Sequence, residues 1–228
     1  MTASELVDGG WDEVVVATGV LARQVTLPGA DRPNVHCYAD VITGAVAVGE
    51  RVAVIGAGGI GFDVSEFLMH TGATGAPQSR DDWMREWREK RPGHLARRSR
   101  RGHARVLPAP GVPAQRKASK IGAGLGRTSG WVHRGTLQHR GVEMIRGVAY
   151  QRVDDAGLHI TVGTKHPKPR QLEVDDVVIC AGQESRRDLL DDLCAAGTSV
   201  HVIGGADVAD EVDAKRAIDQ GTRLAAAL

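Results

Sequence analysis

The sequence predicts an α/β protein with a doubly wound, mostly parallel β-sheet. Short runs of β-branched residues alternate with helical segments, and a glycine turn joins one such run to a helix. Strands that alternate with helices are typical of parallel sheets, because each strand returns through a crossover connection. Apolar residues make up 42% of the 228 residues and aromatic residues only 4%, so valine, isoleucine, leucine and alanine should fill the core.

The expected strands are short and rich in β-branched residues, which favour extended backbone. They cover 11–19, 51–55, "GVEMI", "GVAYQRV", "GLHITV", "EVDDVVICAG" and "SVHVIGGAD". Helices are expected over 59–70, around 134–140 and over 212–228. Segment 20–49 is interpreted as a connector and 71–115 as irregular, since proline, glycine and charged residues punctuate both.

Composition narrows the class of protein. The formal net charge is +1, which gives no whole-molecule case for a nucleic-acid or membrane partner. No apolar run approaches the roughly 18 residues of a membrane span, and the N-terminus lacks the pattern of a signal peptide. Cys37, Cys180 and Cys194 are far apart and form no C-x-x-C pair. We therefore expect a cytoplasmic protein with reduced thiols and no metal site.

The stretch "RVAVIGAGGIGFDVSEFL", residues 51–68, carries the clearest chemical signal. Gly56, Gly58 and Gly61 match G-x-G-x-x-G between a strand and a helix, as in Rossmann-like nucleotide-binding domains. The first glycine permits the sharp turn, the second lets a pyrophosphate approach the backbone, and the third allows the helix to pack closely. The pattern favours a bound dinucleotide; a tight turn that binds nothing is the alternative.

The residue after the second strand usually distinguishes NAD from NADP, because an acid there binds the ribose hydroxyls. Asp81 and Asp82 lie near the usual distance but in a charged stretch that does not resemble a strand end. Further on, "AQRKASK" offers Arg116 and Lys117, a guanidinium and an ammonium that suit a phosphate monoester. A solvated basic loop is the alternative interpretation.

Other catalytic or binding patterns are weak. Between residues 85 and 105 there are nine Arg or Lys against two acids, which we interpret as a solvated or disordered loop. Only Trp83 and Trp87 lie near this run, so a nucleic-acid interface is not expected. No G-x-S-x-G or Ser/His/Asp arrangement is present, and the histidines lack metal-binding spacing.

Five segments together carry a resemblance: "VAVIGAGGIGFDVSEFL", "QRKASKIGAGLGRTSGWVHR", "GVEMIRGVAYQRVDDAGLHI", "VVICAGQE" and "HVIGGADVADEVDAKRAIDQGTRLA". They resemble the bacterial NADPH-dependent 2,4-dienoyl-CoA reductases of fatty acid β-oxidation. This group also includes old-yellow-enzyme-like proteins and trimethylamine dehydrogenase. The second segment is the most specific, and the resemblance covers nearly the whole chain.

The resemblance is to the C-terminal third of such an enzyme. Members begin with a β/α barrel that carries FMN and the dienoyl-CoA site, followed by an iron–sulfur cluster. An FAD-binding domain comes next, with the NADPH domain inserted into it. The resemblance therefore implies a fragment: a tail of the first flavin segment over 1–30, an NAD(P)H-binding domain over 31–180 and a second, incomplete flavin segment over 181–228. The barrel and the first flavin segment would be missing.

The resemblance also assigns roles to residues. The NADPH pyrophosphate would lie on Gly56, Gly58, Gly59, Ile60 and Gly61. The 2′-phosphate would bind Arg116 and Lys117, and residues 122–126 would form a loop beside the nicotinamide rather than a second nucleotide site.

In "IGGAD", Gly205 and Asp207 would belong to the second flavin motif, with Asp207 on the ribityl chain. A helix N-cap or turn acid is the alternative role for Asp207. Asp213 and Ala214 would face the flavin ring. No catalytic residue is assigned, and without the first flavin motif we expect weak FAD binding or none.

One segment departs from the family pattern. "RVLPAPGVPAQRK" carries three prolines where an apolar strand should precede the basic pair. Proline cannot donate to a β-ladder. The sequence therefore leaves open whether a strand forms over 106–115.

Overall fold

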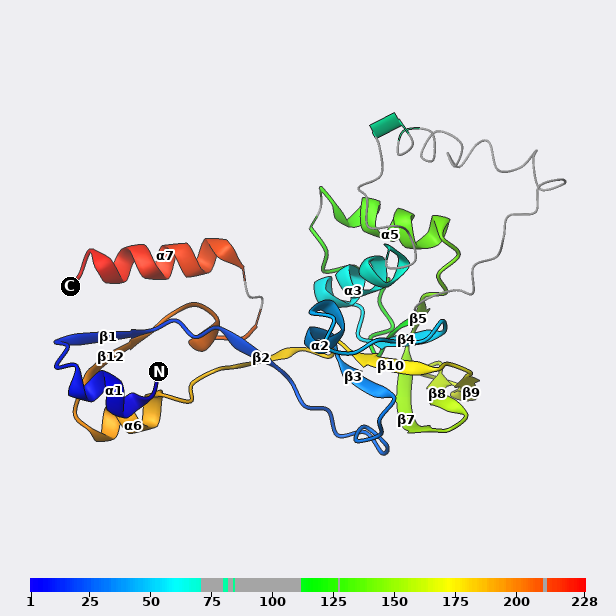
Figure 1. Ribbon diagram of the computed structural model, residues 1–228. Helices are drawn as coiled ribbons and strands as arrows, with labels where there is room; N and C mark the ends of the chain where they lie inside the picture. The colour runs from blue at the N-terminus through cyan, green and yellow to red at the C-terminus, as the bar shows by residue number, and fades with distance from the viewer. Residues whose placement is uncertain (71–79, 82–83, 85–111, 127, 211–212) are drawn as a thin grey trace, which may run out of the picture. The chain divides into compact units, whose positions relative to one another are not determined.

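The computed structural model describes residues 1–70, 80–81, 84, 112–126, 128–210 and 213–228 (Figure 1). The chain divides into two compact units. Residues 25–181 form the larger unit, and residues 1–24 together with 182–228 form the smaller one. The basic run over 85–105 lies outside the described residues.

The larger unit contains a five-stranded, all-parallel sheet in the order β3-β10-β4-β5-β6. Its strands are β3 (Val35–Cys37), β10 (Asp176–Ile179), β4 (Val52–Ile55), β5 (Val112–Gln115) and β6 (Ile145–Arg146). Its helices are α2 (Tyr38–Ile42), α3 (Gly59–His70) and α5 (Gly130–His139). This parallel sheet with crossover helices confirms the predicted Rossmann-like α/β fold class.

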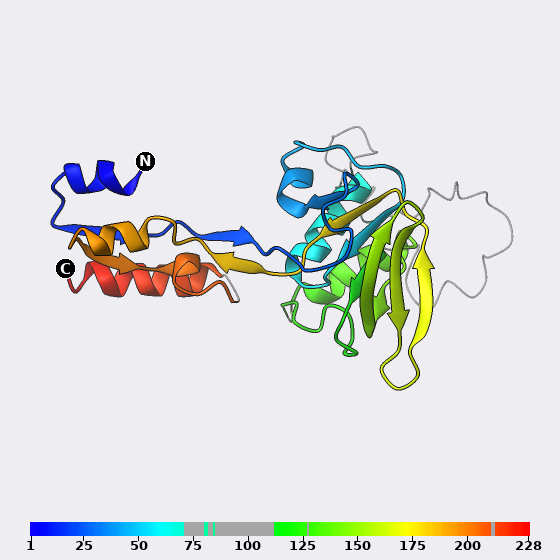
Figure 2. The same cartoon turned by 90° about the horizontal axis from the view of Figure 1, so that it is seen from below.

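An antiparallel meander accompanies the parallel sheet. It consists of β7 (Val148–Asp154), β8 (Gly157–Val162) and β9 (Lys168–Leu172), paired in that order. Figures 1 and 2 show the helices on one side of the parallel sheet and the meander on the other. The larger unit therefore has three layers.

Alternation along β4 divides the core of the larger unit between these layers. Val52 and Val54 pack with α3, whereas Ala53 and Ile55 pack with Leu158 and other apolar residues of the meander. All four β4 side chains are buried, as expected for a central parallel strand covered on both faces.

A strand does form in the proline-rich segment, so the interpretation of 71–115 as irregular is wrong at its C-terminal end. Ala114 accepts a hydrogen bond from the Gly56 N–H at 3.0 Å, so its polar groups face β4. Its neighbour Pro113 therefore faces β6, where pairing begins only at Ala114 and Gln115. The missing N–H of Pro113 falls where no β6 residue is paired, which explains why the proline is tolerated.

The smaller unit pairs segments from both ends of the chain. Its elements are α1 (Ala3–Asp8), β1 (Glu13–Val16), β2 (Val20–Ala22), β11 (Gln183–Ser185), α6 (Leu190–Ala195), β12 (Ser199–Val202), the 3₁₀ turn η1 (Gly204–Ala206) and α7 (Ala214–Ala225). β1 runs parallel to β12, and β2 runs antiparallel to β11. Its core is a single cluster in which Val14, Val16, Leu193 and Ala206 are buried.

Segment 20–49 is not only a connector: it contains β2, β3 and α2. These elements have three to five residues, too few for a hydrophobic period to emerge from the sequence. The expected helix over 59–70 is confirmed by α3. In the part of the chain that the structure describes, no helix is both long and apolar enough to cross a bilayer.

Candidate nucleotide-binding site

The glycine turn follows β4, and two of its glycines are required by packing. Gly56 has a φ of 109°, and a Cβ there would lie 2.4 Å from the Cys180 carbonyl oxygen. A Cβ on Gly61 would lie 2.1 Å from the Gly56 carbonyl oxygen, so α3 can approach the turn only without a side chain there. These are the first and third roles of the glycine motif, the turn and the close helix contact.

Gly58 and Gly59 have a different environment. Both are exposed, and an added Cβ on either would meet no heavy atom within 4 Å. Gly59 begins α3, and Ile60, half-buried, packs against the core beneath. The first N–H groups of a helix lack intrahelical partners and favour anions. The open surface at Gly58 thus fits the second role of the motif, close approach of a pyrophosphate to the backbone.

The basic pair follows the neighbouring strand. β5 ends at Gln115, and Arg116 and Lys117 come directly after it with exposed side chains. The Gln115 side chain donates to the Lys117 and Ser119 carbonyls at 2.9 and 3.1 Å, which holds this loop in a tight bend. Since β4 and β5 are parallel neighbours, the glycine turn and the basic pair leave the same edge of the sheet.

Tyr150, which the sequence analysis did not single out, lies beneath this edge. Its hydroxyl donates to the Ala114 carbonyl at 2.5 Å. Burial raises the pKa of Tyr150 to about 12, although a hydrogen bond from the Gly56 N–H and the charge of Arg116 both act to lower it. The hydroxyl therefore lies between the glycine turn and the strand that carries the basic pair. Strand β7 was expected from the sequence, but nothing local indicated this contact.

The smaller unit presents a second glycine turn after β12. A Cβ on Gly205 would lie 2.9 Å from Val20 Cγ1, so this turn packs directly against the start of β2. Gln220 of α7 joins the turn on two sides: its Oε1 accepts from the Gly204 N–H, and its Nε2 donates to Asp207 Oδ2, both at 2.7 Å. No described residue donates to Asp207 Oδ1, so this oxygen can accept a ligand hydroxyl. Gln220 was not anticipated from the sequence.

The start of α7 is built around Asp213. Its Oδ1 accepts the Arg216 N–H at 2.7 Å, which makes Asp213 the N-cap of the helix. Ala214 is the first residue of α7 and is exposed. The Arg216 guanidinium donates to the Asp210 carbonyl at 2.9 Å and the Val208 carbonyl at 2.5 Å, which ties these two residues to the first turn of α7. Together these contacts give the smaller unit an ordered helix start beside its glycine turn.

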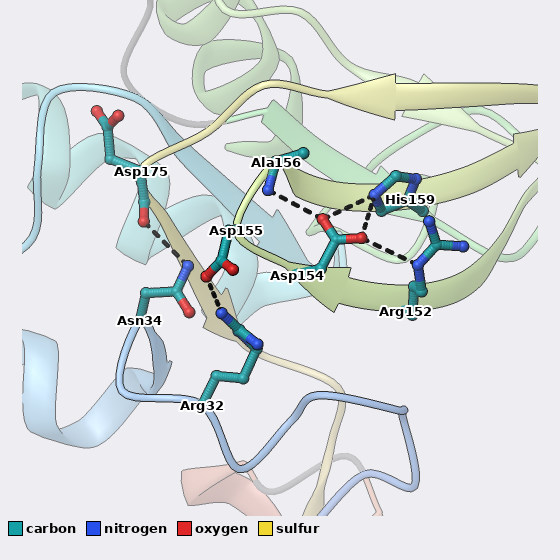
Figure 3. Close-up of polar contacts among 8 residues, drawn as sticks. All are labelled: Arg32, Asn34, Arg152, Asp154, Asp155, Ala156, His159 and Asp175. Carbon is teal, nitrogen blue, oxygen red and sulfur yellow. Dashed lines mark hydrogen bonds and ion pairs between the residues drawn. The ribbon is translucent and has the colours of Figure 1, made fainter.

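A polar cluster in the larger unit stabilises the turn between β7 and β8 (Figure 3). The Asp154 carboxylate accepts bonds from His159 at 2.9 Å, from the Ala156 N–H at 3.0 Å and from Arg152 at 3.0 Å. These donors, His159 first, hold the pKa of Asp154 at about 2. The cluster spans one tight turn and serves the meander rather than the nucleotide edge.

Residues 3–213 match the pyridine nucleotide-disulphide oxidoreductase family. The chain belongs to this family. Proteins of the family bind FAD and NAD(P)H. The match spans both units, so it covers the glycine turn after β4 and the one after β12.

Individual relatives are similar over most of this chain but only part of their own length. A probable ferredoxin reductase, CtmF, from Castellaniella defragrans (strain DSM 12143 / CCUG 39792 / 65Phen) is 25% identical over 177 residues, which is 75% of this chain and 34% of that protein. The solved 2-naphthoyl-CoA reductase, in complex with 2-naphthoyl-CoA, superposes with a TM-score of 0.74 at 18% identity, over 98% of this chain and 28% of that one. Histamine dehydrogenase from Rhizobium sp. 4-9 gives 0.68 at 16% identity, over 99% and 32%. This chain thus spans about a third of the length of each.

Proposed function

We propose that the chain binds NADPH in its larger unit and contributes part of a flavin site in its smaller unit, as a section of a flavin-linked oxidoreductase. The observation that carries this proposal is the glycine turn after β4. Gly56 and Gly61 are glycines because the protein packs against them, whereas Gly58 is a glycine with open space beside it. A turn that served only the fold would not need a glycine at position 58.

Preference for NADPH is proposed from the basic pair. Arg116 and Lys117 lie at the end of the strand next to the glycine turn, where a ribose 2′-phosphate is bound in doubly wound folds. None of the described hydrogen bonds or ion pairs uses either side chain. A guanidinium and an ammonium would pair with a dianionic phosphate through charge-assisted hydrogen bonds.

In the smaller unit, Gly205, Asp207, Asp213 and Ala214 are proposed to contact FAD. The Gln220 bond orients the Asp207 carboxylate and leaves one oxygen for a ribityl hydroxyl. Retention of FAD should be weak or absent, because this unit offers one glycine turn and a parallel sheet of only two strands among the described residues. When bound, NADPH supplies a hydride that a flavin accepts, and the protein's part is to position the two rings.

The whole reaction is proposed to be that of a 2,4-dienoyl-CoA reductase. The resemblance of "QRKASKIGAGLGRTSGWVHR" supports this, and so does the fold shared with 2-naphthoyl-CoA reductase. Acyl-CoA chemistry, FMN and an iron–sulfur cluster would then belong to parts of the enzyme other than residues 1–228. Domain limits of 1–30, 31–180 and 181–228 and a cytoplasmic setting in β-oxidation are part of the same proposal.

Exposed apolar side chains in the smaller unit support a missing flavin segment. Val15 on β1 is 43% exposed and Ile218 on α7 is 67% exposed. Parallel strands are normally covered on both faces, so further chain packing here would bury them. The larger unit, by contrast, has three core clusters of its own. This contrast favours a second candidate function, an NAD(P)-binding module without catalysis.

Parallel titrations with NADPH and NADH, followed by nicotinamide fluorescence, test the proposal. Replacing Arg116 and Lys117 with alanine should weaken NADPH binding about tenfold or more per lost contact and leave NADH nearly unchanged. The control removes two exposed lysines of the meander, Lys165→Ala with Lys168→Ala, and should change neither affinity. Equal losses for NADPH and NADH in the first variant would reject the 2′-phosphate assignment.

Supplying FAD in the same experiment separates the two candidate functions. Reduction of added FAD by NADPH in the presence of the chain, faster than without it, supports the flavin-linked oxidoreductase. NADPH binding without any such reduction supports the non-catalytic module. A chain that binds neither nucleotide would be a non-functional fragment.

A further inference from the structure

A cavity of about 350 Å³ lies between α5, β6 and the loop after β5. Its walls combine positive charge with an apolar floor. They are formed by Lys120, Ile121, Arg134, Gln138, Val142, Met144 and Arg146. A volume of this size falls at the lower end of the range for small-molecule sites.

None of the described residues that line the cavity is acidic. Glu143 lies between the two lining residues Val142 and Met144, but both of its oxygens bind Arg170 at 2.7 Å. Glu66, the acid that α3 presents to α5, binds His133 at 2.8 Å. The acids nearest to the cavity in sequence or by helix packing are thus bound to other partners, and no ion pair among the described residues compensates Lys120, Arg134 or Arg146.

Arg134 is oriented by a backbone carbonyl. Its Nη1 donates to the Gly122 carbonyl at 2.9 Å, and the side chain is half-buried. Gly122 in turn has a φ of 68° and packs against Phe62 of α3, whose ring an added Cβ would approach to 2.9 Å. A guanidinium carries five N–H donors, so this one bond orients Arg134 and leaves donors for an anion.

The cavity and the proposed NADPH 2′-phosphate contact are formed by different residues. Arg146 is the register partner of Gln115, and Ile145 is the partner of Ala114. Ala114 and Ile145 pack against the meander, so Arg146 points to the helical side. Neither Arg116 nor Lys117 is among the residues that line the cavity. The two groups of cations are therefore separate.

We propose that this cavity binds a phosphate monoester carried on a flat aromatic ring system, such as an adenosine phosphate. Lys120, Arg134 and Arg146 would hold the phosphate, and Ile121, Val142 and Met144 would contact the ring. The proposal goes beyond the assignment of the glycine turn and of Arg116. It also accounts for the strongest motif in the sequence, because Lys120, Ile121 and Arg134 all belong to "QRKASKIGAGLGRTSGWVHR".

The test uses 2′-AMP as the probe, in isothermal titration calorimetry with the whole chain carrying Arg116→Ala and Lys117→Ala. This background removes the basic pair, so that remaining affinity reports on the cavity. We expect 2′-AMP to bind more tightly than adenosine, and Lys120→Gln or Arg146→Gln to weaken it about tenfold each. Lys165→Gln, a matched loss of one exposed charge in the meander, should have no effect.

Two outcomes would overturn the proposal: 2′-AMP that binds no better than adenosine in the background chain, or affinity that neither cavity variant changes. Circular dichroism and thermal melting of Lys120→Gln and Arg146→Gln show whether they fold. Because both side chains are exposed, unfolding is not expected.

A competition arm in the same Arg116→Ala and Lys117→Ala background identifies the source of the phosphate. Displacement of 2′-AMP by NADPH indicates that the cavity takes the adenosine end of the same nucleotide, whereas simultaneous binding indicates a separate adenosine phosphate. Both results support the cavity. A Gly56→Ala variant should lose NADPH but keep 2′-AMP; unchanged NADPH binding in this variant would count against the glycine turn, not against the cavity.

Discussion

The separate roles of Gly61 in packing and of Gly58 in nucleotide binding can be tested with two alanine substitutions. In Gly61→Ala, the new Cβ lies 2.1 Å from the Gly56 carbonyl oxygen, well short of the 3.4 Å of an ordinary contact. Both atoms belong to the backbone or are fixed to it, so α3 has to shift. Overpacking of this kind costs up to about 3 kcal/mol, and alanine returns about 1 kcal/mol through helix propensity. The net loss should be about 2 kcal/mol.

Gly58→Ala should have the opposite effect on stability. The added Cβ meets no heavy atom within 4 Å, and Gly58 is absent from the glycines with positive φ. Reduced freedom of the unfolded chain then stabilises the protein by about 0.4–1 kcal/mol. The same methyl group occupies the surface proposed for the pyrophosphate, so NADPH affinity should fall about tenfold or more, which corresponds to ~1.4 kcal/mol.

Differential scanning calorimetry and NADPH titration measure both effects. For a chain of this size, 1 kcal/mol shifts Tm by about 2–4 °C, so Gly61→Ala should melt about 4–8 °C lower and Gly58→Ala slightly higher than the parent. Gly221→Ala on α7 is the control, since its Cβ would make only an ordinary contact at 3.8 Å with Ile203. It should stabilise without changing NADPH binding. A Gly58→Ala chain that binds NADPH as well as the parent would refute the reasoning.

Two further predictions concern titratable groups of the meander. Because the pKa of Tyr150 is raised to about 12, its neutral form supports folding fully below pH 10, and this support is lost as the pH rises from about 10 to 12. Ultraviolet absorbance should show a late tyrosine titration that is absent in Tyr150→Phe; a parent chain without a late titration, or a late titration that persists in the variant, would contradict the assignment. The pKa of Asp154 is lowered to about 2, so its contribution is present above pH 4 and is lost as the pH falls from about 4 to 2. Acid unfolding followed by circular dichroism should therefore be less steep in that window for Asp154→Asn than for the parent, and equal slopes would show that the carboxylate is not held as Figure 3 shows.

The parts of the fold that the sequence predicted are those with local signals. The run of apolar residues in β4, the glycine turn and the apolar period of α3 occur within 18 consecutive residues, so their order alone indicates strand, turn and helix. Strand β8 and the strand-turn over 199–207 were equally local. The contacts of the glycines were not local: the atoms that exclude a Cβ at Gly56 belong to Cys180, which directly follows β10, a strand that pairs with β4 from far along the chain.

Short paired elements were missed for a different reason. β2 and β11 have three residues each and exist because Val20, Leu21 and Ala22 pair with Ser185, Glu184 and Gln183. Three residues carry no period, and propensity is a weak guide when long-range pairing decides the backbone. The same holds for β5, where Pro113 argues against a strand until the short extent of β6 is known.

The candidate site follows from these long-range pairings more than from its motif. Gly56 lies between β5, through the Ala114 carbonyl, and β10, through the Cys180 carbonyl, and Tyr150 reaches the same Ala114 oxygen from the meander. Burial of the surrounding core raises the pKa of the Cys180 thiol, so this neighbour stays neutral beside the turn. A pyrophosphate on Gly58 would therefore be held by a turn whose conformation is fixed on three sides. Because the contacts come from the parallel sheet and the meander, all within residues 25–181, nucleotide binding should depend on the core of the larger unit and not on the completeness of the smaller one.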